Sequence, residues 1–303
     1  METLEREYVA MRTFHFMIFF LCASVAQAQQ ELELWPDQAP PYSQPVEDSE
    51  YIDDCWGGVR CAHRVTTPTL TLYPSEEQSQ AWVMVAPGGG YDVVAIYHEG
   101  SEIAQAFVER GISAAVLKYR IPDARTATQP EKVPFADFRR AMKLLRIEQE
   151  KAGVSNGKIG VVGFSASGHL AVYSMVHPDP NPELNPDFAI LAYGTSLLNP
   201  VNRDWLEKNL YYRTLTEEEE QREVLLNWVT KNTPPAFLVH AVDDDVSHYT
   251  ESTMYADALR DKSVDAELHL FAHGGHGFGP GRDSDGTSQW LGLAANWIER
   301  LYK

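Results

Sequence analysis

The 303-residue sequence is poor in cysteine, in basic side chains and in long apolar runs. Of its three cysteines, Cys55 and Cys61 have a spacing that matches no usual pair of zinc ligands, so we expect neither a metal site nor a catalytic cysteine. Lysine and arginine number 25 against 43 aspartates and glutamates, which gives a formal net charge of −18. Such a charge disfavours nucleic acid and anionic lipid as partners and favours neutral or cationic ones.

The apolar run at residues 14–25 is too short to cross a bilayer, which takes about 20 residues. It follows Met11 and Arg12 and ends at Ala26-Gln27-Ala28, a pattern typical of a secretory signal peptide and its cleavage site. We therefore predict a signal peptide at 1–28 and a secreted or periplasmic protein without a stable membrane anchor. In an exported protein, Cys55 and Cys61 are expected to form a local disulfide, with two free thiols as the alternative.

Residues 29–66 are rich in Pro, Asp and Gln and predict an irregular N-terminal arm, followed by one catalytic domain at 67–303. Apolar strands alternate there with amphipathic helices, which indicates an α/β fold with a mostly parallel central sheet and helices on both faces. Residues 195–233 interrupt this alternation as an insertion, in which Thr216 and Glu219 predict a capping box. The expected strands are 70–73, 82–86, 114–117, 159–162, 188–192, 237–239 and 267–271, and the expected helices are 101–110, 135–150, 168–173, 249–261 and 289–302.

Residues 163–168, Gly-Phe-Ser-Ala-Ser-Gly, lie between a predicted buried strand and a predicted helix. A serine on such a tight turn is the nucleophile elbow of an α/β-hydrolase, because the turn lifts the hydroxyl clear of the backbone. Ser165 is the predicted nucleophile. Ser167 is the alternative, and it fits worse because it would place Ser165 and His169 where small residues are needed. Ser167 also stands where the usual pattern has glycine.

A histidine and an acid that follow the serine along the chain complete a Ser, Asp, His order. We assign His276, in a glycine-rich loop after the strand at 267–271, as the base, with His273 as the alternative. The acid comes from Asp243-Asp244-Asp245, just beyond the strand at 237–239. Asp244 is the choice and Asp243 remains open. In this role Asp244 orients His276 and stabilises its imidazolium.

The glycines at 88–90 follow the strand at 82–86 and predict an oxyanion-binding loop. The expected donors are the main-chain N–H groups of Gly89, Gly90 and Ala166. A phosphate-binding loop is disfavoured, because no Lys-Ser/Thr pair follows these glycines. Ester hydrolysis by these groups requires no metal and no cofactor.

Three further residues near this loop are candidate substrate-binding groups. The imidazole of His98 and the carboxylate of Glu99 could bind a sugar hydroxyl, or they could be a structural histidine and a helix-capping glutamate. Tyr91 could stack on a sugar ring or pack in the core.

These motifs together resemble those of secreted bacterial α/β-hydrolases related to acetylxylan and feruloyl esterases. The resemblance runs from about Thr67 to the C-terminus, with Ser167 and the Val246-Ser247-His248 segment as departures from the family pattern. It is carried by residues 87–91, 98–100, 116–120, 163–171 and 274–279.

The resemblance implies a serine esterase that removes acetyl or similar small acyl groups from plant or algal polysaccharide such as xylan. A feruloyl or general carboxylesterase would use the same catalytic residues. A secreted serine exopeptidase would use the same triad, usually with a further propeller or cap domain. A non-catalytic carbohydrate-binding protein on the same fold is the remaining alternative, and the intact Ser, Asp, His order argues against it. The oligomeric state has no sequence signal.

Overall fold

The computed structural model describes residues 29–45, 50–77 and 79–302, so the predicted signal peptide lies outside the described residues. Its centre is an eight-stranded sheet with the order β1-β4-β7-β5-β8-β9-β10-β11. Strands β7, β5, β8, β9, β10 and β11 are parallel to one another. Strand β4 pairs with β7 in the antiparallel direction, and β1 pairs with β4 in the same way. The predicted fold class is therefore confirmed.

All predicted strands and helices occur within a few residues of their expected positions. The strands are β1 (Gln30–Glu33), β2 (Tyr51–Asp54), β3 (Arg60–His63), β4 (Thr69–Tyr73), β5 (Ala81–Ala86), β6 (Val93–Val94), β7 (Ala114–Lys118), β8 (Lys158–Phe164), β9 (Phe188–Ala192), β10 (Ala236–Ala241) and β11 (Ala266–Phe271). The helices are α1 (Glu102–Val108), α2 (Val133–Lys151), α3 (Ala166–Val176), α4 (Pro200–Leu206), α5 (Glu217–Glu223), α6 (Thr250–Asp261) and α7 (Trp290–Leu301).

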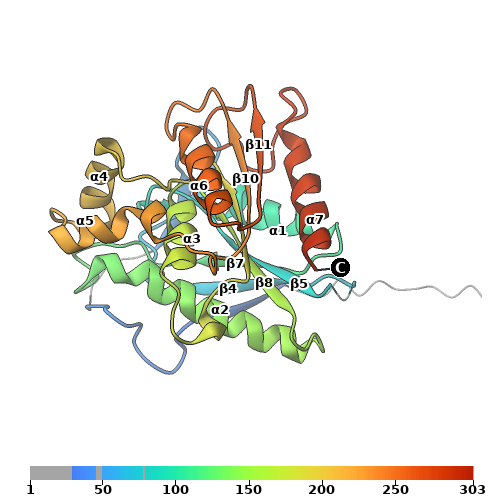
Figure 1. Ribbon diagram of the computed structural model, residues 1–303. Helices are drawn as coiled ribbons and strands as arrows, with labels where there is room; N and C mark the ends of the chain where they lie inside the picture. The colour runs from blue at the N-terminus through green and yellow to red at the C-terminus, as the bar shows by residue number, and fades with distance from the viewer. Residues whose placement is uncertain (1–28, 46–49, 78, 303) are drawn as a thin grey trace, which may run out of the picture.

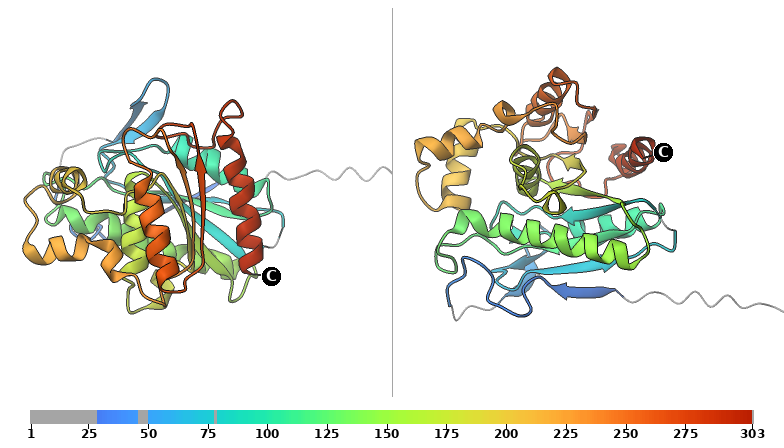
Figure 2. Two further views of the ribbon diagram at one scale, coloured as in Figure 1. Left: turned by 45° about the horizontal axis from the view of Figure 1, so that its top comes forward. Right: turned by 60° about the horizontal axis from the view of Figure 1, so that its bottom comes forward.

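The helices cover both faces of the sheet (Figures 1 and 2). On one face α1 and α7 pack their apolar side chains into a core that contains Phe107 and Trp297. On the other face α2, α3 and α6 enclose a second core that contains Phe138, Leu170 and Tyr255. Strands β5, β8, β9 and β10 are buried along nearly their whole length because helices cover them on both sides. No helix of the described residues has the length and apolarity needed to cross a bilayer.

The N-terminal arm is more regular than the predicted irregular segment at 29–66. Strand β1 joins the main sheet beside β4, while β2 and β3 form a hairpin that pairs with β6 in a separate three-stranded sheet. A disulfide joins Cys55 and Cys61 across this hairpin. The prediction of an irregular arm is wrong because these strands have only four residues each, and β1 and β3 also pair with strands outside the arm, β4 and β6.

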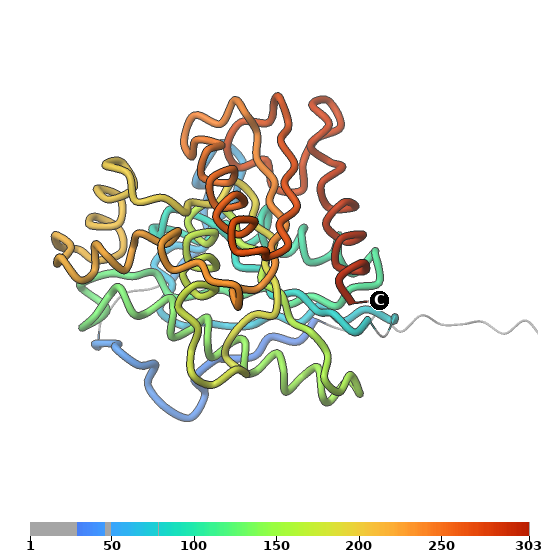
Figure 3. Tube along the Cα trace, in the orientation of Figure 1, coloured from blue at the N-terminus to red at the C-terminus, as the bar shows by residue number. Residues whose placement is uncertain are grey.

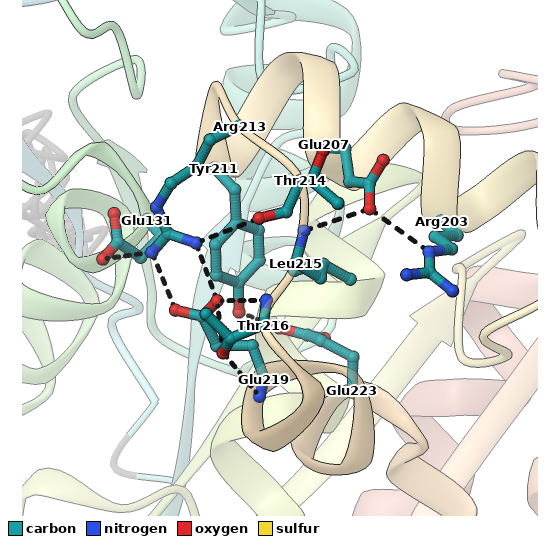
Figure 4. Close-up of polar contacts among 10 residues, drawn as sticks. All are labelled: Glu131, Arg203, Glu207, Tyr211, Arg213, Thr214, Leu215, Thr216, Glu219 and Glu223. Carbon is teal, nitrogen blue, oxygen red and sulfur yellow. Dashed lines mark hydrogen bonds and ion pairs between the residues drawn. The ribbon is translucent and has the colours of Figure 1, made fainter.

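The insertion between β9 and β10 carries α4 and α5, drawn in gold and orange at one side of the sheet in the trace of Figure 3. The predicted capping box is present: Thr216 accepts a bond from the Glu219 N–H, and the Glu219 carboxylate accepts one from the Thr216 N–H. Both guanidinium nitrogens of Arg213 bind Glu219 at 2.7 Å (Figure 4). Arg213 also lies 3.5 Å from Glu131, which precedes α2, so these charges fix the insertion to the body of the protein.

A buried ion pair fixes the N-terminal arm in the same way. Arg120 and Asp137 are almost fully buried and form two side-chain hydrogen bonds of 2.7 and 2.8 Å. The Trp35 indole donates to Asp137, and the remaining Arg120 nitrogen donates to the Pro41 carbonyl and to Ser43. The pair thus closes 35–43 onto α2.

Replacing Asp137 by alanine is expected to lower the free energy of unfolding by about 3–5 kcal/mol, because it leaves the Arg120 guanidinium buried without its carboxylate. Urea denaturation followed by circular dichroism measures the loss. The matched control is Asp204→Ala, which removes the partner of exposed Lys208 and should cost about 0–1 kcal/mol. Equal losses in the two variants would contradict the anchoring role.

Candidate active site

Ser165 occupies the sharp turn between β8 and α3. Its backbone angles, φ 49° and ψ −118°, fall in the positive-φ region that non-glycine residues rarely adopt. The hydrogen bonds of Ser167 explain why a serine stands where the usual pattern has glycine. Its buried hydroxyl accepts a 2.8 Å bond from the Phe164 N–H and donates to the Ala86 carbonyl. Ser167 therefore ties the turn to the end of β5 and is not exposed for catalysis.

The structure brings the three predicted catalytic side chains together. Ser165 Oγ lies 2.8 Å from His276 Nε2, and His276 Nδ1 lies 2.8 Å from Asp244 Oδ2. A carboxylate can only accept, so His276 carries its proton on Nδ1 and its Nε2 accepts the serine hydroxyl. This arrangement can take a proton from Ser165 and stabilise the resulting imidazolium.

Asp244 is buried and held by four donors. Its Oδ1 accepts bonds from the N–H groups of Val246 and Ser247, and its Oδ2 lies 3.2 Å from His240 Nε2 as well as accepting from His276. Burial alone would raise the pKa of Asp244, but the hydrogen bonds from His240, His276 and the Ser247 N–H lower it below its usual value. The carboxylate is therefore ionised at neutral pH.

The alternatives to this acid and base contact each other instead. Asp243 accepts a bond from the Gly275 N–H at 2.8 Å and lies 3.3 Å from His273 Nδ1. The bond from Gly275 and the contact with His273 lower the pKa of Asp243. The His273 side chain is mostly exposed. Asp243 thus holds the backbone of the loop that carries His276, and neither alternative reaches Ser165.

The glycine loop lies directly against the nucleophile. A Cβ atom on Gly88 would approach the Phe164 carbonyl to 2.7 Å and Ser165 Cβ to 3.1 Å, so only glycine allows this contact. Gly89 has φ +133°, and its carbonyl accepts the N–H groups of Asp92 and Val93. Gly89, Gly90 and Ser165 line one cavity, and Ala166 begins α3, where the first N–H groups have no partner within the helix.

Glu99 connects the loops of this site and also lines the cavity in front of Ser165. Its side chain is buried, Oε2 accepts the Gly88 N–H at 2.7 Å, and Oε1 accepts the Tyr193 hydroxyl at 2.8 Å. That hydroxyl in turn accepts the Gly279 N–H at 3.0 Å. Burial raises the pKa of Glu99, and the two hydrogen bonds oppose this rise. Both oxygens of Glu99 have partners within the protein, and substrate contact by Glu99 stays a prediction.

Of the two alternatives for Tyr91, packing in the core is confirmed and stacking on a sugar is corrected, because its side chain is fully buried. Its ring stacks on Trp205 of the insertion, and its hydroxyl lies 3.0 Å from His169 Nδ1. His98 has a structural contact and also lines the cavity: its Nε2 donates to the Gly277 carbonyl. Substrate contact by His98 stays a prediction.

A buried polar network that the sequence did not indicate supports the glycine loop from the insertion. His169 lies one helical turn after Ser165 and links Tyr91 to Glu223. Its Nδ1 contacts the Tyr91 hydroxyl, and its Nε2 lies 2.8 Å from Glu223 Oε2. Tyr211 donates to the other Glu223 oxygen at 2.6 Å (Figure 4). The Trp205 indole donates to the Gly90 carbonyl at 2.9 Å. These partners lie far apart in the sequence, so no local pattern signals them.

The cavity in front of Ser165 has a volume of about 470 Å³. It is bounded by the glycine loop, the acid and histidine loops and the tip of the β2–β3 hairpin. Residues lining it include Trp56, Gly90, His98, Ser165, Val246 and His276. The site thus combines a hydroxyl bonded to imidazole, candidate oxyanion donors and space for a small ester.

The comparison with protein families matches residues 101–303, more than half of the chain, to the prolyl oligopeptidase family. The chain belongs to the prolyl oligopeptidase family. The matched residues 101–303 include Ser165, Asp244 and His276. The glycine loop and the β2–β3 hairpin precede the matched residues.

A curated relative and a solved structure confirm the resemblance to acetylxylan esterases, and a second curated relative is named as a xylanase. Endo-1,4-beta-xylanase B of Butyrivibrio fibrisolvens is 31% identical over 74% of this chain and 36% of its own length. The acetylxylan esterase of Xylanibacter ruminicola is 28% identical over 77% of this chain and 48% of its own length, so the chain spans less than half of either relative. The acetyl ester-xyloside bifunctional hydrolase of Caldicellulosiruptor lactoaceticus has a TM-score of 0.75 at 28% identity, covering 92% of this chain and 98% of its own.

Replacing Asp244 by asparagine is expected to lower kcat by about 10⁴-fold, because the amide stabilises the wrong tautomer of His276 and no longer stabilises its imidazolium. Asp243→Asn is the matched neighbouring variant and should lower kcat by about 10-fold or less, since this side chain only supports the loop. Initial rates with saturating p-nitrophenyl acetate measure both effects. A larger loss in the Asp243 variant would reverse the assignment of the acid.

Replacing Glu99 by glutamine is expected to lower kcat/KM by about 10- to 100-fold, because it disturbs the bonds to Gly88 and Tyr193 and displaces the oxyanion donors. The loss should be the same for ethyl acetate and for an acetylated xylo-oligosaccharide. A loss confined to the carbohydrate ester would show that Glu99 contacts sugar after all.

Proposed function

We propose that the protein is a serine esterase that removes acetyl or similar small acyl groups from a polysaccharide such as xylan. The observation that carries the proposal is the hydrogen-bond chain from Ser165 through His276 to buried Asp244, placed under the glycine loop at the mouth of a cavity. The protein is a carboxylic ester hydrolase, and its relatives named for acetylxylan and acetyl-xyloside hydrolysis support an acetylated carbohydrate as the substrate.

The reaction begins when His276 Nε2 takes the proton of Ser165 Oγ as this oxygen attacks the ester carbonyl. The oxyanion that forms accepts hydrogen bonds from the N–H groups of Gly89, Gly90 and Ala166. Breakdown of the tetrahedral intermediate breaks the bond to the alcohol oxygen. The sugar hydroxyl leaves with the proton held by His276 and an acyl-enzyme remains.

Water completes the cycle by the same route. His276 takes a proton from the attacking water, and the acid leaves as Ser165 recovers its proton from the imidazolium. Asp244 stays ionised throughout and stabilises the imidazolium in both halves of the reaction. The predicted signal peptide supports the further proposal that the protein is exported to where polysaccharide is found.

Replacing Ser165 by alanine is expected to reduce acetate release from acetylated xylan by about 10⁴- to 10⁶-fold, because no acyl-enzyme can form. Enzymatic assay of free acetate measures the loss. The control is Ser79→Ala, since Ser79 precedes β5 at the opposite end of the sheet and should be dispensable. Substantial release by the Ser165 variant would contradict the mechanism.

The substrate class is tested with the wild-type protein on three esters and one amide. Release from acetylated xylan supports the proposal, whereas turnover of p-nitrophenyl acetate alone would indicate another ester. Preference for a feruloylated arabinoxylan fragment would indicate a feruloyl esterase. Cleavage of aminoacyl p-nitroanilides with no ester preference would indicate a peptidase.

A further inference from the structure

The hairpin of β2 and β3 reaches over the cavity that contains Ser165. It stands out from the body of the protein in the left view of Figure 2, as a pair of blue strands. Trp56 and Val59, from the turn of this hairpin, line the same cavity as Ser165 and His276. The hairpin is therefore part of the wall that an approaching substrate meets.

The tip of the hairpin is held in one conformation. The Cys55–Cys61 disulfide closes the loop, and the Cys55 N–H donates to the Val59 carbonyl at 2.9 Å. The Asp54 carboxylate accepts the Gly58 N–H at 2.5 Å. A surface turn with so many cross-links loses little conformational entropy when it binds a ligand.

The hairpin is also fixed relative to the nucleophile. Strand β3 pairs with β6, which directly follows the glycine loop, and Cys61 packs against Val93 and Ala95 in a small core of their own. The Arg60 guanidinium lies 5.4 Å from the centre of the Tyr97 ring, next to His98. These contacts hold the hairpin that carries Trp56 against the segment after the glycine loop, and Trp56 lines the cavity that contains Ser165.

Trp56 is 56% exposed, and Val246, which lines the same cavity, is 70% exposed. An exposed tryptophan on a rigid support at the edge of a site is an apolar surface that favours a flat partner with apolar faces and polar edges. A pyranose ring has this shape, with C–H groups on its faces and hydroxyl groups around its rim. Among the described residues lining the cavity, the acidic side chains are Glu99 and Asp245, so an anionic sugar is disfavoured.

We propose that Trp56 is a sugar-binding platform that stacks on a neutral pyranose ring of the polysaccharide chain, beside the unit whose ester is cleaved. The inference rests on the proposed function, because it takes the acylated sugar at Ser165 as the neighbouring unit. It identifies Trp56 as a specificity-determining residue that acts on oligosaccharide substrates and leaves the ester chemistry unchanged.

The first test compares kcat/KM for Trp56→Ala on ethyl acetate and on an acetylated xylo-oligosaccharide. We expect about a 10-fold loss on the oligosaccharide and no change on ethyl acetate, which has no ring to stack. Trp56→Phe should recover most of the loss. The matched control is Trp228→Ala, because Trp228 is 44% exposed on the insertion and does not line the cavity. Equal loss in the Trp228 variant, or loss on both esters in the Trp56 variant, would overturn the proposal.

The second test measures binding without chemistry, by isothermal titration calorimetry of the protein with unacetylated xylohexaose. The wild type and Trp228→Ala should bind equally, and Trp56→Ala should bind about 10-fold more weakly. Binding that depends on Trp56 without any acetate release from xylan would support the platform and refute the acetylesterase function. Acetate release with no effect of Trp56 in either test would leave that function standing and refute the platform.

Discussion

The site depends on the two hydrogen bonds that the buried carboxylate of Glu99 accepts. Loops after parallel strands are separate segments, and nothing in the sheet itself sets their distances to within the tolerance that catalysis needs. Glu99 accepts the Gly88 N–H and the Tyr193 hydroxyl, and Tyr193 accepts the Gly279 N–H. Glu99 and Tyr193 together thus join the loops that follow β5, β9 and β11. Its burial is tolerated because both oxygens have donors.

The order of strands and helices could be predicted from local signals, as could the positions of Ser165 and His276, which the structure brings together with Asp244. Buried strands appear as apolar runs, and a serine flanked by small residues marks the turn after one of them. The choice between Asp243 and Asp244 had no such signal. It depends on a turn in which the N–H groups of Val246 and Ser247 bind Asp244. Asp243 instead binds the N–H of Gly275 in the loop that carries His276.

The wrong predictions concern side chains whose surroundings come from distant parts of the chain. Tyr91 follows three glycines and could face a ligand, but Trp205 of the insertion covers its ring and His169 binds its hydroxyl. Similarly, all four residues of β2 are exposed to solvent, and this strand exists through pairing with β3. Sequence periodicity reports burial on one face, so it does not detect a strand that buries neither face.

The chain divides into residues 101–303, which match the family, and an N-terminal segment that precedes them. The part matched to the prolyl oligopeptidase family starts at residue 101 and contains Ser165, Asp244 and His276, to which we assign the bond-breaking chemistry. The glycine loop and the β2–β3 hairpin precede that part. Glu99 binds both Gly88 and Tyr193, and Trp205 binds the Gly90 carbonyl, so the glycine loop is fixed to the matched part. The β3–β6 pairing joins the hairpin to the segment that follows the glycine loop. Because the hairpin contacts none of the three reacting side chains by hydrogen bond, its sequence can change without disturbing them. Substrate preference can therefore vary through the N-terminal segment while the catalytic geometry is retained.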